Sequence, residues 1–126
     1  MVNSKTEIND DSSKSFEIAR EIINVAENLQ AQDILLLDVR GVCSYADAFV
    51  LLSGASDRQI NSIKEAIDQH FGKGTQKLLH SEGDAPSGWI LMDYSDVIVH
   101  IFSPSGRNYY GLEHVWRDAK DLVRIQ

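Results

Sequence analysis

The amino-acid sequence predicts an α/β fold in which helices pack against a mixed β-sheet. Apolar residues recur at helical spacing in three segments, and β-rich runs stand between them, in the order helix, two strands, helix, three strands, helix. The chain has 126 residues, of which 43% are hydrophobic and 25% charged, and it shows no internal repeat. A chain of this size and composition can bury one core, so we expect a single domain over residues 15–126.

The first predicted helix follows a polar segment, residues 1–14, which we expect to be a disordered tail because it has little to bury. From Ser15 onward an apolar stripe recurs at helical spacing and consists of Ile18, Ile22, Val25, Ala26 and Leu29. Two dense apolar runs then predict buried strands at residues 34–39 and 47–53, with a turn between them.

The second predicted helix begins after Ser56. Ser56 and Gln59 have the spacing of a capping box, and Asp57 lies where the helix dipole favours a negative charge. Apolar positions keep the 3.6-residue period as far as Phe71, and Gly72 predicts the end of the helix.

The remaining predicted elements are one edge strand, one hairpin and a last helix. Residues 77–81 indicate a short edge strand, and residues 82–88, with two glycines and a proline, indicate a loop. Two β-rich runs at residues 88–94 and 96–102, separated by a tight polar turn, predict a β-hairpin. A final helix is expected over residues 109–123, where apolar side chains again recur at helical intervals.

The charge of the chain favours a basic partner protein. Lys and Arg number 12 and Asp and Glu number 19, which gives a formal net charge of −7. Nucleic-acid phosphates repel such a surface, so we expect no direct sequence-specific nucleic-acid binding and attraction toward basic proteins instead.

Several site classes have no support in the sequence. The single cysteine, Cys43, cannot form an internal disulfide, and no Cys/His cluster has the spacing of a metal site, so we expect no metal and no cofactor. No apolar run approaches the roughly 18 residues of a membrane span. The polar N-terminal segment lacks the features of a secretory or organellar signal, so we expect a cytoplasmic protein.

The predicted hairpin has one apolar face and one mixed face. The apolar face, which we expect under the helices, consists of Ile90, Met92, Val97, Val99 and Ile101. The mixed face consists of Trp89, Leu91, Asp93, Asp96, Ile98, His100 and Phe102. Exposed aromatic and aliphatic side chains with an acidic rim are typical of a protein-binding surface. The alternative is that helices cover both faces and that this row belongs to the core.

A second functional hypothesis is enzymatic. The turn Gly54-Ala55-Ser56, between a strand and a helix, has amides that could hold a phosphate, as in a magnesium-dependent nucleotidyltransferase. A capped helix start explains the same residues, because the turn lacks a longer glycine motif or a Walker lysine. No nucleophile motif and no pair of alternately spaced carboxylates supports catalysis.

The chain also resembles a known family. The resemblance rests on Asp33-Ile34-Leu35, Cys43-Ser44-Tyr45-Ala46-Asp47, Ser56-x-Arg58-Gln59, Glu82-Gly83, the run from Gly88 to Tyr94, the run from Asp96 to Pro104, and Tyr109-Tyr110-x-Leu112-Glu113-x-x-Trp116. In this order the motifs are similar to those of the ribosomal silencing factor family, also called the Iojap-like family. The resemblance extends from the first predicted strand to about Trp116.

The resemblance implies a fold similar to the nucleotidyltransferase fold, without known catalysis. It implies binding to the large ribosomal subunit through the ribosomal protein numbered fourteen on the intersubunit face, which blocks joining of the small subunit. It also implies a role of related organellar proteins in large-subunit assembly, and a homodimer when free. The contact residues that we infer from the matching motif are Trp89, Leu91, Asp93, Tyr94 and Asp96. For each of them, a role as core residue or turn former is the alternative.

The sequence departs from the family pattern at Ser105-Gly106 and Gly111, where more helix-favouring or polar residues are common, and in the hairpin turn. Ser95 stands in the hairpin turn where glycine is usual. A turn that requires a positive φ would be less favourable with serine, so the sequence leaves the turn type open.

Overall fold

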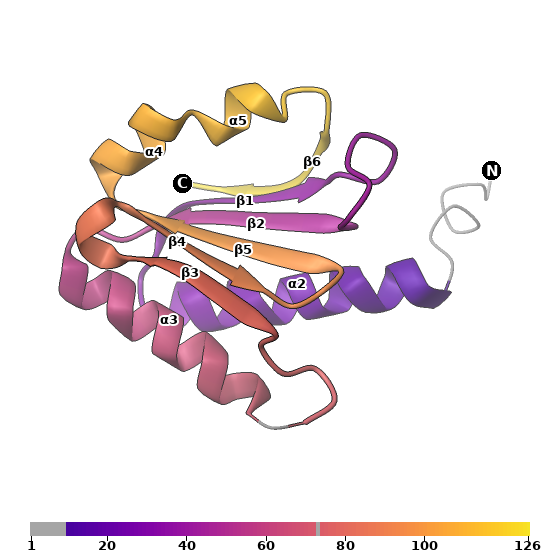
Figure 1. The fold of residues 1–126 in the computed structure, drawn as a ribbon, viewed down its shortest axis with the longest axis horizontal. Coiled ribbons are helices and arrows are strands. Elements are labelled where there is room, and N and C mark those ends of the chain that lie inside the picture. The colour runs from indigo at the N-terminus through magenta and orange to yellow at the C-terminus, as the bar shows by residue number, and fades with distance from the viewer. Residues whose placement is uncertain (1–9, 73) are drawn as a thin grey trace.

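The computed structural model describes residues 10–72 and 74–126, and within them six strands form one mixed sheet (Figure 1). The strands are β1 (Gln32–Asp38), β2 (Ala48–Ser53), β3 (His80–Asp84), β4 (Trp89–Asp93), β5 (Val97–Phe102) and β6 (Lys120–Ile125). Their order across the sheet is β3-β4-β5-β2-β1-β6. β2 and β5 pair in parallel and all other neighbours are antiparallel, which confirms the predicted mixed sheet.

Helices lie on both sides of this sheet. The long helices α2 (Asp10–Asn28) and α3 (Asp57–Phe71) cover one face, and the short helices α4 (Pro104–Tyr110) and α5 (Leu112–Val115) lie over the other (Figure 1). A single 3-10 turn, η1 (Ala85–Ser87), connects β3 to β4. Helix α2 begins at Asp10, so residues 10–14 of the predicted tail are helical, and residues 1–9 lie outside the described residues.

The apolar stripe of α2 and the apolar face of the hairpin meet in the larger core. Ile22, Ile63 and Val99, from α2, α3 and β5, are each 0% exposed. A second cluster lies on the opposite face of the sheet and contains Leu35, Leu37, Phe49, Leu51, Ile98 and Phe102. Both faces of the central strands are therefore buried, which explains their continuous apolar runs.

The start of α3 confirms the predicted cap. The Ser56 hydroxyl accepts a hydrogen bond from the Gln59 amide at 3.1 Å, and the Gln59 side chain accepts one from the Ala55 amide at 2.6 Å. Gln59 also donates to the carbonyl oxygens of Leu29 and Gln30, so the same side chain connects α3 to the end of α2. These bonds satisfy amides that a helix start leaves without partners.

The C-terminal region differs from the prediction. Residues 109–110 and 112–115 are helical, but the single helix expected over residues 109–123 is wrong in its bounds. Helix α4 begins at Pro104, where Ser103 accepts the Gly106 amide at 3.0 Å, and it is capped by Gly111, which has φ +56°. A left-handed glycine ends a helix because its amide turns back onto the preceding carbonyl groups. The last residues then pair with β1 as strand β6.

The third strand also differs from the prediction. β3 runs from His80 to Asp84, so its second half occupies residues that we predicted to be a loop. Gly83 has φ +83° and lies so close to β4 that a Cβ there would overlap the carbonyl oxygen of Trp89. Glycine is required for this close approach, so here it marks an irregular strand and not a loop.

The hairpin turn between β4 and β5 contains a strained residue. Ser95 has φ +75°, while Asp96, the second central residue, does not have a positive φ. Positive φ at the first central position alone is the pattern of a type II′ turn, which favours glycine there. The turn is held by the Asp93 carboxylate, which accepts the Ser95 amide at 2.7 Å.

Ser95→Gly is therefore expected to stabilise the chain by about 0.5–1 kcal/mol, because the positive φ costs a serine more than a glycine. Urea unfolding monitored by tryptophan fluorescence measures the change in the free energy of unfolding. Ser44→Gly, at an exposed position without a positive φ, is the matched control and should be neutral or slightly destabilising. Equal effects of the two substitutions would contradict the assigned strain.

Candidate functional site

The second face of the sheet is only partly covered. Helices α4 and α5 lie on this side of the sheet (Figure 1) and pack against side chains of β5, β2 and β1. Alternate side chains of the neighbouring β4 are only partly buried. The strand register places Trp89 opposite Phe102, Leu91 opposite His100, and Asp93 opposite Ile98. The β5 members of these pairs are buried, whereas Trp89, Leu91 and Asp93 are half-buried. The β5 half of this face therefore belongs to the core, whereas the β4 half is partly open, and its contact role stays a prediction.

Trp89 is held in a fixed orientation on this face. Its indole Nε1–H donates a hydrogen bond to Nδ1 of His100 at 3.2 Å. Its ring packs against Tyr110, with 4.7 Å between ring centroids, and against Phe102 at 5.4 Å. A large side chain that is already ordered loses little conformational entropy when a partner covers it, which favours Trp89 as a binding anchor.

His100 supports Trp89 from beneath. The side chain is 4% exposed, and burial lowers its pKa to about 3, so the imidazole is neutral at physiological pH. Because Nδ1 accepts the Trp89 hydrogen bond, the neutral ring carries its hydrogen on Nε2. Nε2 is buried and has no hydrogen-bond partner among the described residues. The buried His100 ring therefore makes one hydrogen bond among the described residues, and this bond orients Trp89.

The two aspartates lie at the end of the hairpin. Asp93 is half-buried and uses one carboxylate oxygen to hold the Ser95 amide, so it has a structural role as well as a negative charge. Asp96 is exposed, and its carbonyl oxygen accepts the amides of Asp47 and Ala48 at 2.8 and 3.1 Å. These backbone bonds join the turn to the start of β2. The Asp96 carboxylate forms no hydrogen bond or ion pair within the described residues.

Tyr94 does not lie on this surface, in contrast to the prediction. It is 0% exposed and packs against Phe71 in the core under α2 and α3, with 5.1 Å between ring centroids. Burial raises the pKa of its hydroxyl, as does the nearby charge of Asp68. The physical reason is strand alternation, which places Tyr94 on the same face as Ile90 and Met92. We therefore leave Tyr94 out of the candidate site.

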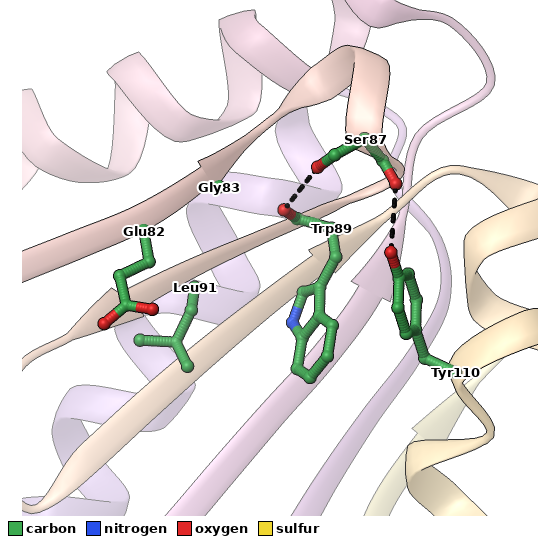
Figure 2. Close-up of a pocket in the computed structure, with 6 residues that line it drawn as sticks. All are labelled: Glu82, Gly83, Ser87, Trp89, Leu91 and Tyr110. Carbon is green, nitrogen blue, oxygen red and sulfur yellow. Dashed lines mark hydrogen bonds between the residues drawn. The ribbon is translucent and has the colours of Figure 1, made fainter.

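A pocket of about 220 Å³ lies beside Trp89, and sequence reasoning did not find it. Its lining residues are Glu82, Gly83, Ser87, Trp89, Leu91 and Tyr110 (Figure 2). Glu82 was expected in a loop and Tyr110 inside a longer helix, so nothing predicted their proximity. The only signal was that both residues lie in motifs of the resemblance.

The turn that suggested an enzyme has a structural explanation. The amides of Ala55 and Gln59 are used by the helix cap, and the Gly54 amide donates to the Phe102 carbonyl oxygen at 2.9 Å. A Cβ at Gly54 would lie 2.8 Å from Ile60, so glycine lets α3 pack closely against the strand. In the described part of the chain, no three His, Cys, Asp or Glu side chains form a cluster that could hold a metal ion.

Comparison with known proteins decides the family. The family model described as "Ribosomal silencing factor during starvation" matches residues 11–126. The chain belongs to this family. A ribosomal silencing factor of Bacillus subtilis is 37% identical over 93 residues, which cover 74% of this chain and 79% of that protein. The chloroplast Iojap protein of Zea mays is 32% identical over 90% of this chain, which spans about half of that longer protein.

Solved structures of similar proteins support the fold of this ribosomal silencing factor family member. A Chromobacterium violaceum protein of 28% identity superposes with a TM-score of 0.77, over 82% of this chain and 86% of that one. A Bacillus halodurans protein of 26% identity has a TM-score of 0.69 and covers 82% of this chain and 94% of its own. The α/β fold is therefore shared.

Family membership classes the chain with the ribosome-associated, non-enzymatic regulators that the name ribosomal silencing factor describes. The enzymatic hypothesis accordingly loses its basis, since the Gly54 turn serves the helix cap. Among the described residues, no helix is long and apolar enough to cross a membrane.

Proposed function

We propose that this chain represses translation by binding the large ribosomal subunit and keeping the small subunit from joining it. The partner is a basic ribosomal protein on the intersubunit face, the one numbered fourteen. The contact surface consists of Trp89, Leu91, Asp93 and Asp96. The supporting observation is a half-buried tryptophan, oriented by His100 and packed against Tyr110, on a partly covered sheet face of a chain with net charge −7.

The chemistry of this surface suits such a partner. Trp89 and Leu91 supply apolar area that a partner removes from water, which is the main source of binding free energy at an interface. We place the carboxylates of Asp93 and of Asp96, which is exposed in the hairpin turn, at the rim of the contact surface, where opposite charges increase the association rate and select the partner. Affinity is therefore expected to fall moderately as salt concentration rises.

The direct test is a subunit-joining experiment. Purified chain is added in excess to free large subunits, small subunits are then mixed in, and light scattering records the rate at which the subunits associate. We expect the chain to sediment with large subunits, not with small subunits, and to slow joining in proportion to its occupancy. Joining that is equally fast with and without the bound chain would refute the proposal.

Three further properties belong to this proposal. We place the chain in the cytoplasm, we propose that it is a homodimer when free, and we propose that it also acts in assembly of the large subunit. Sedimentation equilibrium of the free chain tests the dimer, with a mass of 14.1 kDa per protomer as the reference. Precursor large subunits that accumulate when the chain is depleted would support the assembly role.

A further inference from the structure

The pocket beside Trp89 has apolar walls and one charged side chain. Figure 2 shows Glu82, Leu91 and Trp89 extending to the same side of the sheet, with Tyr110, from α4, beside the Trp89 ring. Gly83 also lines the pocket, to which it contributes backbone atoms only. Glu82 is the only ionisable acid or base among the lining residues apart from the Tyr110 phenol, and no Lys or Arg lines the pocket. The pocket is therefore an apolar groove that ends at a carboxylate.

The polar atoms of the two aromatic walls are already used within the protein. The Trp89 indole N–H donates to His100 at 3.2 Å, and the Tyr110 hydroxyl donates to the Ser87 carbonyl oxygen at 3.3 Å. These bonds leave the ring surfaces, not the polar atoms, to contact a ligand. A ligand that fits must therefore lie against aromatic rings without requiring hydrogen bonds from them.

The Glu82 carboxylate is available to a donor from outside. Its side chain is 67% exposed, and Oε2 interacts with His80 Nε2 at 2.7 Å. Oε1 has no hydrogen-bond donor within the described residues. The register places Glu82 opposite Leu91 and Asp84 opposite Trp89, so a second carboxylate lies on the same side of the edge strand. A cation that enters the pocket therefore meets the Glu82 carboxylate, while Asp84, whose carboxylate accepts the Ser87 amide at 3.0 Å, adds negative charge nearby without lining the pocket.

From these features we infer that the pocket receives an arginine side chain of the partner protein. The guanidinium group lies flat against Trp89 and donates hydrogen bonds to Glu82, and the methylene groups cover Leu91. Guanidinium is the side-chain cation that is planar, stacks on aromatic rings and pairs with a carboxylate through two hydrogen bonds. A lysine ammonium is compact and strongly hydrated, so it uses the ring surface less well. This inference deepens the proposed function and rests on it for the identity of the partner.

A direct probe of the pocket is N-acetyl-arginine amide, titrated into the ¹⁵N-labelled chain at constant ionic strength. We expect localised shift changes at the amides of Glu82, Gly83 and Leu91 and at the Trp89 indole. N-acetyl-lysine amide should bind several-fold more weakly, and the neutral isostere N-acetyl-citrulline amide should leave these signals unchanged. Changes that are absent, or equal for arginine and citrulline, would overturn the inference.

Glu82→Gln tests the same pocket in the complex. The variant keeps the size of the side chain but removes its charge, so we expect about tenfold weaker binding to free large subunits. Glu65→Gln removes an exposed carboxylate from α3, on the opposite side of the sheet, and should bind as the unmodified chain does. Equal affinities of the two variants would overturn the inference.

The two experiments separate this inference from the proposed function. If the chain binds large subunits through Trp89 but arginine amide produces no local shifts, the arginine pocket is wrong and the proposed function stands. If arginine amide binds beside Trp89 and Glu82→Gln removes that binding, but the chain does not bind large subunits, the pocket is supported and the proposed function is wrong.

Discussion

Trp89→Ala is expected to weaken binding to free large ribosomal subunits by about thirtyfold or more, which corresponds to about 2 kcal/mol. The substitution removes the largest half-buried side chain of the open sheet face and the group that His100 orients. Co-sedimentation of labelled chain with large subunits at fixed salt measures the change. Leu122→Ala is the matched control, because Leu122 is 40% exposed on β6 at the opposite edge of the sheet.

Because Trp89 packs against the rings of Phe102 and Tyr110, Trp89→Ala also lowers the free energy of unfolding. Two milder variants therefore complete the test. Trp89→Phe keeps an aromatic ring against Tyr110 and Phe102 but loses the hydrogen bond to His100, and we expect a smaller loss of affinity. Leu91→Ala removes apolar area next to Trp89 and should also weaken binding. Folded variants that bind within twofold of the unmodified chain would show that the partner lies elsewhere.

The second large effect is a loss of stability in mild acid caused by His100. In the folded chain burial lowers its pKa to about 3, whereas an unfolded histidine has a pKa of about 6.5. Below pH 6.5 the unfolded state therefore binds a proton that the folded state does not, and the free energy of unfolding falls. By pH 5 the loss from this group alone is about 2 kcal/mol, and it vanishes about one pH unit above the unfolded pKa.

His100→Asn removes this titration while its side-chain oxygen can still accept the Trp89 hydrogen bond. Urea unfolding at pH 7, 6 and 5 should show a shallower pH dependence for the variant than for the unmodified chain, even if the variant is less stable at every pH. In the unmodified chain, NMR should show no titration of the His100 ring between pH 7 and 4.5. Parallel stability curves, or a ring that titrates near pH 6, would contradict the assigned burial.

Local patterns predicted most elements of the fold correctly. The capping pair Ser56 and Gln59 and the hairpin of β4 and β5 appear in the structure where the sequence placed them. Strand alternation also predicts that Tyr94 is buried, because it places Tyr94 on the same face as Ile90 and Met92. We assigned Tyr94 a contact role instead because it lies in the family motif. The short-range rules were reliable here because each depends on neighbouring residues alone.

Local sequence patterns did not predict strand β6 or the pocket beside Trp89. Residues 120–125 have an ambiguous pattern, and they form a strand because the edge of β1 offers unpaired backbone groups after Gly111 has ended α4. The pocket depends on Glu82 and Tyr110, which are separated in the chain and meet beside Trp89 only when β3 pairs with β4 and α4 packs over β5. Backbone pairing at the edge of the sheet decides β6, and strand pairing together with the packing of α4 decides the pocket; local propensity decides neither.

Composition and local periodicity therefore established the α/β class, the negative charge and the row of side chains that includes Trp89 and Leu91. Which half of that row is exposed was decided by α4 and α5, since these short helices cover β5 and leave β4 partly uncovered. The same tertiary contacts turned Trp89 into an oriented anchor, because its partner His100 comes from a different strand. The exposure and orientation of Trp89 depend on how separate elements pack together, so no single segment of the sequence determines them.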